Sequence, residues 1–163
     1  MSEFPLVSIC VPTFNSGRYI QKMLRSISSQ TYKNIEVIIS DNCSTDNTFE
    51  LLQEYKHFFN WKINQNSKNL GALNNMSQLI QSARGKYIAI YHEDDTYESD
   101  IVQKSVMILE NSSKVSMVST LGNSIDEYDN ILSTFTLPKT FEPNKPLNFK
   151  QVFSEILSQR LFF

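Results

Sequence analysis

The stretch that decides the fold is IEVIISDNCSTDN, residues 35–47. Its first five residues are mostly Ile and Val, which predicts a strand covered on both faces, as in a parallel sheet. The residues after it are Ser, Asp, Asn and Thr, which are typical of a loop. In an open α/β sheet, ligands bind beyond the carboxyl ends of such strands. The polar half of this stretch is therefore a candidate binding loop.

The same alternation continues on both sides of this stretch. Runs rich in apolar residues predict strands at 6–11, 35–39, 61–64, 87–91 and 115–121. Apolar residues at helical spacing predict helices at about 20–27, 48–56, 71–84 and 101–109. Strands that alternate with helices imply a mostly parallel sheet with right-handed crossovers, and so a Rossmann-like α/β fold.

Three details of this pattern are open to a structural check. The first strand is expected to stop at Pro12, which cannot donate a ladder hydrogen bond. The third helix is expected to bury one side made of Leu73, Met76, Ile80 and Ala83. After Leu121 the rhythm changes, and a hairpin at 125–135 and a further helix at 148–160 are predicted.

Composition narrows the function classes. The 163 residues fit one domain, and a net charge of -2 with no basic block gives no support for nucleic-acid binding. Cys10 and Cys43 lack the spacing of a zinc or redox motif. The polar N-terminal start and the absence of a run of about 20 apolar residues predict a cytoplasmic protein without a transmembrane segment. Peripheral contact with the inner face of the membrane is left open.

A phosphate ligand would need an unusual source of positive charge. The chain has four glycines, and neither G-x-G-x-x-G nor a Walker loop follows the first strand. Three acids, Glu93, Asp94 and Asp95, follow the fourth predicted strand directly. Carboxylates can hold Mn²⁺ or Mg²⁺ against a diphosphate. The competing interpretation is that these acids only begin a helix, and Asp41 could likewise be an ordinary turn residue.

Several blocks together resemble family 2 glycosyltransferases. They are residues 7–15 (VSICVPTFN), residues 26–46 (SISSQTYKNIEVIISDNCSTD), residues 69–71 (NLG) and residues 85–89 (GKYIA), and the match covers about residues 5–121. Four motifs in the family's order make the resemblance specific.

The resemblance implies a GT-A fold, a three-layer sandwich around a mostly parallel central sheet. It implies a single domain over 1–163, with a nucleotide-sugar-binding core at 5–121 and the incomplete start of an acceptor half at 122–163. It also implies that the C-terminal part of the fold is truncated. Carried over by position, the nucleotide-sugar-binding residues would be Pro12, Thr13, Asn15, Asp41, Asn69, Gly71, His92 and Asp94. The metal ligands for Mn²⁺ or Mg²⁺ would be Asp94 and Asp95.

The chain departs from the family pattern in two ways. His92 stands where the family often has the first aspartate of a D-x-D motif, and imidazole adds no negative charge. The family's general base, which takes the acceptor proton, would fall near or beyond Phe163. The 163-residue chain alone is therefore expected to bind donor but to transfer sugar poorly.

The function implied by the resemblance is inverting transfer of a sugar to a glycan hydroxyl, from a nucleoside-diphosphate sugar, often a UDP-sugar. Bacterial cell-surface polysaccharide synthesis, with a glycan or lipid-linked glycan as acceptor, would be the setting. One alternative is a non-catalytic nucleotide-sugar-binding fragment. Another is a sugar-1-phosphate nucleotidyltransferase, which would want a loop richer in glycine and basic residues than residues 13–18.

Overall fold

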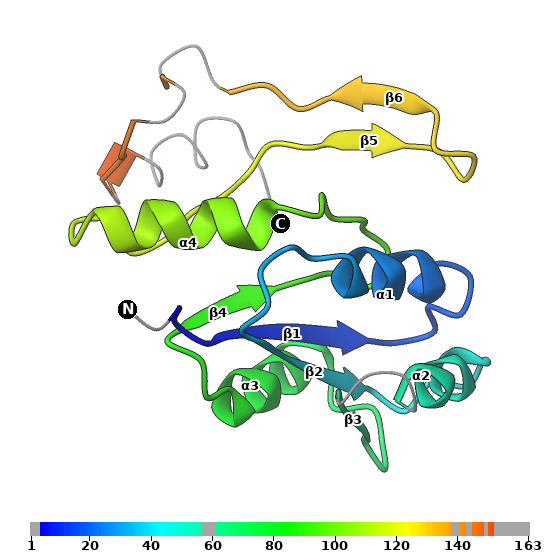
Figure 1. Ribbon diagram of the computed structural model, residues 1–163. Helices are drawn as coiled ribbons and strands as arrows, with labels where there is room; N and C mark the ends of the chain where they lie inside the picture. The colour runs from blue at the N-terminus through cyan, green and yellow to red at the C-terminus, as the bar shows by residue number, and fades with distance from the viewer. Residues whose placement is uncertain (1–3, 57–60, 138–140, 143–144, 149, 152–163) are drawn as a thin grey trace. The chain divides into compact units, whose positions relative to one another are not determined.

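The structure is a computed structural model that describes residues 4–56, 61–137, 141–142, 145–148 and 150–151 (Figure 1). It forms two compact units, residues 1–107 and residues 108–163. The first unit holds the predicted sheet and its helices, and the second holds a hairpin.

The first unit contains a four-stranded parallel sheet with the strand order β3-β2-β1-β4. Its strands are β1 (Val7–Thr13), β2 (Ile35–Asp41), β3 (Lys62–Gln65) and β4 (Tyr87–Ile90). The helices between them are α1 (Ile20–Ser28), α2 (Thr48–Lys56) and α3 (Ala72–Ser82), and α4 (Ile101–Asn111) follows β4. The predicted α/β alternation and the parallel sheet are confirmed.

The helices cover both faces of this sheet, which makes three layers (Figure 1). On one face, Val7, Ile9 and Val11 of β1 pack in a buried core with residues of α1, α2 and the start of α4. On the other face, Cys10 of β1 and Ile38 of β2 pack against Leu79 of α3. Successive side chains of a strand point to opposite faces, so one apolar run serves both cores.

The expectation that Pro12 ends the first strand is wrong, because β1 runs on to Thr13 with Pro12 opposite Ser40. The carbonyl of Cys10 accepts the N–H of Tyr91, so alternate residues of β1 face the β4 side. Pro12 lies two residues further on and faces the same side, beyond the last β4 partner, Ile90. No ladder hydrogen bond is lost there, as at an edge strand.

The predicted buried side of α3 is correct only in part: Ala83 packs against the core and Met76 is half-buried, but the other two residues are exposed. Leu73 is 87% exposed and Ile80 is 43% exposed, whereas Asn75 and Leu79 are buried. Asn75 faces the sheet because its side-chain amide accepts a hydrogen bond from the Ser40 hydroxyl and donates one to the Ser40 carbonyl, near the end of β2. A hydrophobic pattern cannot reveal a helix face whose main anchor is an amide.

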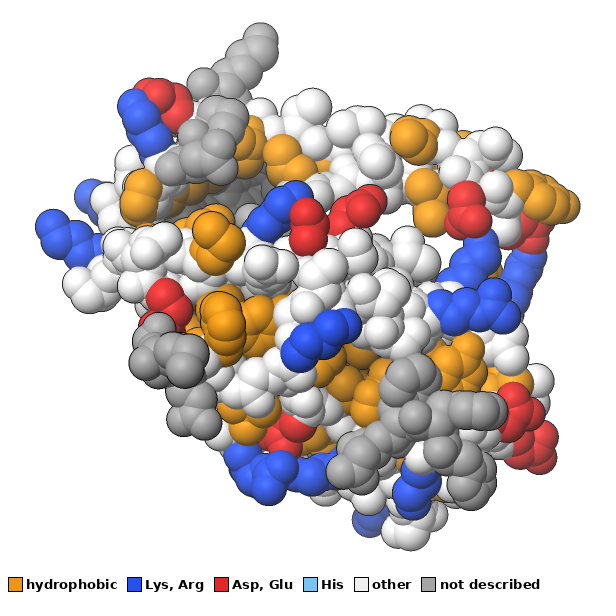
Figure 2. All heavy atoms as spheres, viewed as in Figure 1, with side chains coloured by type: hydrophobic (Ala, Val, Ile, Leu, Met, Phe, Trp, Pro, Cys, Tyr) orange, Lys and Arg blue, Asp and Glu red, His pale blue; other side chains and the backbone are white. Residues whose placement is uncertain are grey.

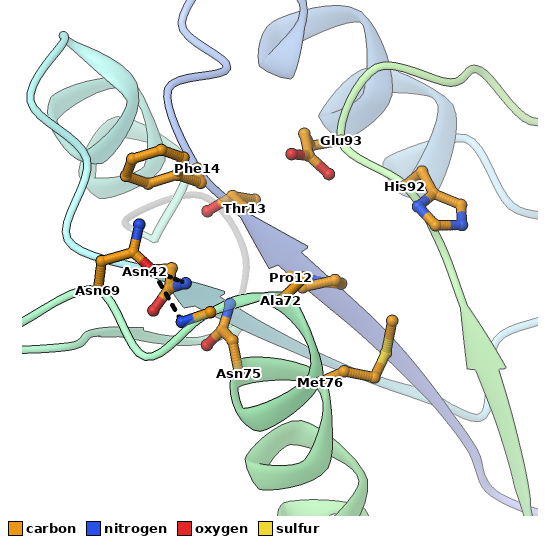
Figure 3. A pocket seen from close by; sticks show the side chains of 11 residues that line it. Pro12, Thr13, Phe14, Asn42, Asn69, Ala72, Asn75, Met76, His92 and Glu93 are labelled. Atoms are coloured by element: carbon orange, nitrogen blue, oxygen red, sulfur yellow. Dashed lines mark hydrogen bonds between the residues drawn. The ribbon is translucent and has the colours of Figure 1, made fainter. Parts of the chain in front are cut away.

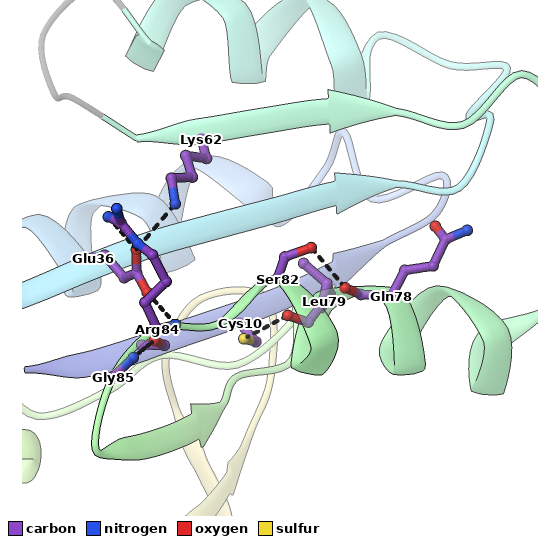
Figure 4. A network of polar contacts seen from close by, with 9 residues as sticks. Cys10, Glu36, Lys62, Gln78, Leu79, Ser82, Arg84 and Gly85 are labelled. Carbon is purple, nitrogen blue, oxygen red and sulfur yellow. Dashed lines mark hydrogen bonds and ion pairs between the residues drawn. The ribbon is translucent and has the colours of Figure 1, made fainter.

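A polar network joins the amino ends of the strands (Figure 4). The Glu36 carboxylate accepts hydrogen bonds from Ser8 Oγ at 2.7 Å and from the Arg84 backbone N–H at 2.7 Å. It also forms ion pairs with Arg84 at 2.9 Å and Lys62 at 3.1 Å. Burial by itself would raise the pKa of Glu36, but these bonds lower it to about 2. One carboxylate thus links β1, β2, β3 and the segment before β4.

We expect Glu36→Gln to destabilise the fold by about 1–2 kcal/mol at pH 7, because the depressed pKa is a gain in folded-state stability. That gain is complete above the unfolded pKa of about 4.3 and is lost as the pH falls toward 2. Urea unfolding at pH 7 and pH 3 should show a gap between wild type and variant that narrows at pH 3. The exposed Glu54→Gln is the matched control, and an equal effect of both changes would contradict this role of the network.

The second unit contains β5 (Asn123–Ile125) and β6 (Ile131–Thr134), which pair antiparallel. This pairing confirms the predicted hairpin, and Asp129 in the connecting turn has a φ of 65°. The strand predicted at 115–121 is wrong: this segment pairs with no strand in the described part of the chain, and Met117 is 71% exposed. An apolar run becomes a strand only where a neighbour accepts its hydrogen bonds. The helix predicted at 148–160 lies mostly outside the described residues.

No helix among the described residues has the length and apolar character needed to cross a membrane. Figure 2 shows Lys and Arg side chains interspersed with Asp and Glu on the viewed face, without a block of one sign. The net charge of the chain is -2, so its overall charge does not favour an anionic ligand.

Candidate nucleotide-binding site

A cavity of about 400 Å³ lies at the carboxyl ends of β1 and β2, beside the start of α3 and the segment after β4 (Figure 3). This is the position at which open parallel sheets bind ligands. The lining residues come from four chain segments: Pro12, Thr13, Phe14, Asn42, Asn69, Gly71, Ala72, Asn75, Met76, His92 and Glu93.

The structure brings together some of the predicted site residues and separates others. Five of them line the cavity: Pro12, Thr13, Asn69, Gly71 and His92. Four do not appear in its lining: Asn15, Asp41, Asp94 and Asp95. Selecting the residues that follow each strand therefore gives a set that includes both cavity-lining residues and residues that do not line the cavity.

A chain of asparagine amides forms one wall of the cavity. Asn42 Nδ2 donates to Asn69 Oδ1 at 2.9 Å, and Asn42 Oδ1 accepts the backbone N–H of Leu70 at 2.9 Å. Asn66 Nδ2 donates to both Asn42 Oδ1 and Asn75 Oδ1. These bonds fix the loop before α3 against the end of β2. The wall offers a ligand neutral donors and acceptors instead of charge.

Sequence reasoning missed six of the lining residues: Phe14, Asn42, Ala72, Asn75, Met76 and Glu93. The most deeply buried of them is Asn75. It is 1% exposed, lines the cavity from the first turns of α3, and accepts the Ser40 hydroxyl hydrogen bond at 2.6 Å. Its amide also donates to the Ser40 carbonyl at 2.9 Å. The only signal in the sequence is that Asn75 lies four residues before the apolar Leu79, and so on the same face of the helix.

Asp41, the last residue of β2, is fully buried, and other side chains already occupy its carboxylate. Gln65 Nε2 donates to it at 2.8 Å, the Ser44 backbone N–H donates at 3.1 Å, and the Ser44 hydroxyl makes a further short bond. Thr13 Oγ1 is 3.4 Å from the same carboxylate. Asp41 therefore holds the ends of β1 and β3 and the following loop together.

Asn15 joins the loops that follow β1 and β2. Its side-chain oxygen accepts the Thr45 N–H at 2.8 Å, and its own N–H donates to Ser44 Oγ at 2.9 Å. The backbone of Asn15 has a φ of 52°, a left-handed conformation that Asn tolerates better than most residues. Asn15 thus fixes the cavity rim without lining it.

The segment after β4 forms an acidic turn, residues 92–95. The Asp95 N–H approaches the His92 carbonyl at 3.4 Å, and Ser16 Oγ donates to the Glu93 carboxylate at 3.2 Å. Asp94 and Asp95 are exposed, whereas Glu93 is half-buried. Tyr97, two residues past the turn, has its pKa raised by burial, so its hydroxyl stays protonated at neutral pH.

The cavity lining supplies little positive charge. None of its eleven lining residues is Lys or Arg. The N-terminus of α3 opens on the cavity at Gly71 and Ala72, and Gly71 has a φ of 79°. A helix N-terminus is equivalent to about half of a positive charge. That is too little to balance a diphosphate.

The acidic turn fits a hard divalent cation only in part. Mg²⁺ and Mn²⁺ prefer carboxylate oxygens as ligands. Asp94 and Asp95 are exposed and offer two carboxylate groups. The described residues contain no group of three His, Cys, Asp or Glu side chains arranged to hold a metal. Mg²⁺ is commonly bound by one or two carboxylates and completed by substrate phosphates and water. The turn suits that kind of site.

Comparison with protein families places this arrangement among known enzymes. The family model for Glycosyl transferase family 2 matches residues 8–162. The chain is 33% identical over 137 residues to a chondroitin synthase of Escherichia coli, covering 82% of this chain and 19% of that protein. It is 38% identical over 99 residues to the abequosyltransferase RfbV of Salmonella typhimurium, covering 58% of this chain and 30% of that protein. The chain thus spans less than a third of either relative.

The fold also matches solved structures. Residues 1–349 of Staphylococcus aureus TarS, in a complex with UDP-GlcNAc, superpose with a TM-score of 0.61 and 27% identity. The match covers 64% of this chain and 31% of that one. The Rossmann-like sheet with helices on both faces is therefore the GT-A fold, as the resemblance implied.

Proposed function

Because this chain belongs to glycosyl transferase family 2, we propose that its cavity binds the nucleotide part of a UDP-sugar. The full protein would be an inverting glycosyltransferase that moves the sugar to a glycan hydroxyl in cell-surface polysaccharide synthesis. Relatives named as abequosyltransferase and as poly(ribitol-phosphate) β-N-acetylglucosaminyltransferase support this setting. The observation that carries the proposal is a cavity at the strand ends, lined by five of the residues that the family resemblance selects.

The lining chemistry suits a uridine better than a more highly charged ligand. Asn42, Asn69 and Thr13 supply neutral hydrogen-bonding groups, and Phe14 is an aromatic side chain that is 41% exposed at the cavity edge. Fixed amides and one aromatic face are the groups that orient a nucleobase and a ribose. Asp41 and Asn15 would contribute indirectly, because their hydrogen bonds fix the loop that follows β2.

The binding of a UDP-sugar requires positive charge to balance its diphosphate. The cavity lining has no Lys or Arg, and the α3 N-terminus supplies only a fraction of a charge. We propose that a divalent cation, Mn²⁺ or Mg²⁺, is held by Asp94 and Asp95 and completed by the diphosphate. When bound, such an ion stabilises the charge that develops on the leaving diphosphate. His92, the first residue of the turn, lines the cavity and would orient the ribose or the phosphates.

Sugar transfer also requires a general base for the acceptor hydroxyl. Direct displacement at the anomeric carbon needs a base to take the acceptor proton. None of the residues that line the cavity is assigned this role, and we propose that they serve donor binding. Family membership gives no support for a sugar-1-phosphate nucleotidyltransferase. A nucleotide-sugar-binding fragment without turnover is the second candidate, favoured by His92 in place of an aspartate.

Filling the cavity tests this proposal. Ala72 lines the cavity at the start of α3, and Ala72→Trp would occupy the space that a nucleotide needs. We expect the affinity for UDP with Mn²⁺, measured by titration calorimetry, to fall roughly 10-fold or more, which equals about 1.4 kcal/mol.

Leu73→Trp is the matched control, because Leu73 is the next residue, is 87% exposed and does not line the cavity. Its affinity should stay within about two-fold of wild type. If Ala72→Trp binds UDP as well as Leu73→Trp does, the nucleotide lies elsewhere and the proposed function is wrong.

A further inference from the structure

The carboxylates of the acidic turn repel one another. Glu93, Asp94 and Asp95 are consecutive, and like charges a few ångströms apart repel one another in the absence of a cation. β4 ends at Ile90, and the last hydrogen bond to β1 runs from the Tyr91 N–H to the Cys10 carbonyl, so residues 92–95 lie beyond the ladder. Something must hold this turn in shape before a cation arrives.

Two tyrosines clasp the turn at its base. The rings of Tyr91 and Tyr97 are stacked, with centroids 3.6 Å apart and planes 10° apart. Tyr91 is 5% exposed and belongs to the main core, against which Tyr97 also packs. The Tyr97 hydroxyl accepts the backbone N–H of His92 at 2.8 Å. The five residues between the tyrosines thus form a closed loop.

The ring and the hydroxyl of Tyr97 make different contacts: the ring stacks on Tyr91, and the hydroxyl accepts a hydrogen bond from the His92 backbone. The ring contributes apolar burial and stacking against Tyr91. The hydroxyl meets the first backbone N–H beyond Tyr91, at the residue that opens the acidic turn. Among the described residues, no hydrogen bond joins the Tyr91 hydroxyl to residues 92–97. Removing the Tyr91 hydroxyl is therefore a control for removing the Tyr97 hydroxyl, since both rings belong to the same stacked pair.

We infer that Tyr97 is a positioning residue for cation binding, and that its hydroxyl holds the His92 backbone so that Asp94 and Asp95 are preorganised. The inference rests on the proposed function, since it concerns the same cation. A ligand set that is already in place loses less conformational entropy on binding than a loose one. Removing the hydroxyl should weaken the cation without changing the nucleotide pocket, because Tyr97 does not line the cavity.

The experiment compares wild type, Tyr97→Phe and Tyr91→Phe. Free Mn²⁺ is measured by electron paramagnetic resonance during titration at saturating UDP, and UDP binding is measured separately without metal. We expect Tyr97→Phe to lower the Mn²⁺ affinity about five-fold, as for the loss of one ordinary hydrogen bond. Metal-free UDP affinity should be unchanged, and Tyr91→Phe should match wild type in both measurements.

Hydrogen exchange gives a second readout that needs no metal. The His92 amide should exchange about five-fold faster in Tyr97→Phe than in wild type, because its acceptor is gone. Its exchange rate in Tyr91→Phe should stay close to that of wild type.

Each other outcome overturns the inference. If wild type binds Mn²⁺ and Tyr97→Phe binds it equally well, the clasp has no role and the proposed function stands. If both variants weaken Mn²⁺ equally, or if metal-free UDP binding falls as well, the effect comes from general packing. If wild type with UDP binds no Mn²⁺, the cation in the proposed function is wrong, and the inference fails with it.

Discussion

Replacing Asp94 and Asp95 together by Asn is expected to lower the affinity for UDP in the presence of Mn²⁺ by roughly 30-fold or more. The two carboxylates are exposed on the turn after β4, and no Lys or Arg in the cavity lining could take over their part. Removing one side of a close charge interaction typically costs about 2 kcal/mol or more, which corresponds to that factor. Titration calorimetry with and without Mn²⁺ measures the loss.

The metal-free titration separates a cation site from a general defect. Without Mn²⁺, the double variant should bind UDP as well as wild type or slightly better, because two negative charges near the diphosphate have gone. Asp100→Asn is the matched control: Asp100 lies on the same segment, but its carboxylate pairs with Lys104 at 2.7 Å. A double variant that keeps its Mn²⁺-dependent affinity would contradict the assignment of the cation to this turn.

The second large effect concerns Gly85, which joins α3 to β4. A Cβ atom built on Gly85 would lie 2.6 Å from the Ser8 nitrogen, 2.7 Å from the Tyr87 oxygen and 2.8 Å from the Leu6 oxygen. All three are backbone atoms, so no side chain can rotate away, and the β1–β4 pairing must shift. We expect Gly85→Ala to cost about 3 kcal/mol, at the upper end of overpacking effects, or roughly 10 °C in the unfolding midpoint.

Gly122→Ala is the control for this change, because no heavy atom lies within 4 Å of a Cβ built there. Its effect should stay below about 0.5 kcal/mol. Thermal unfolding of both variants, followed by circular dichroism, makes the comparison. Equal midpoints for the two variants would show that the close approach at Gly85 does not exist in solution.

The sequence predicts the first unit well where one local pattern decides the outcome. The helix predicted at 48–56 is α2 itself, and the apolar run at 35–39 lies within β2. In the strand, the consecutive residues Val37, Ile38 and Ile39 are all buried, as expected for a strand covered on both faces, and in the helix Leu52 is buried while Phe49 and Tyr55 pack against the core. The hairpin in the second unit is likewise marked by a local turn around Asp129.

Prediction fails where the outcome depends on a distant partner. Pro12 stays in β1 because β4 is short on that side, which the sequence of β1 does not contain. The apolar run at 115–121 forms no strand because nothing in the described chain pairs with it. The buried side of α3 was misjudged because Asn75 is held by Ser40, which lies 35 residues away in the sequence.

The same distinction applies to the candidate site. Reading the residues after each strand selects Pro12, Thr13 and His92, which do line the cavity. It cannot separate them from Asp41, whose carboxylate points into bonds with Gln65 and Ser44. Strand-end position is encoded locally, whereas the direction of a polar side chain depends on partners from other loops.

The most direct test of the central claim is a crystal of this chain soaked with UDP and Mn²⁺, with anomalous scattering recorded for manganese. We predict one manganese peak within direct ligand distance of the Asp94 and Asp95 carboxylates, with diphosphate oxygens completing its coordination and the uracil in the cavity beside Asn42 and Asn69. UDP bound in the cavity with no manganese at the turn, or bound away from the cavity, would contradict the claim.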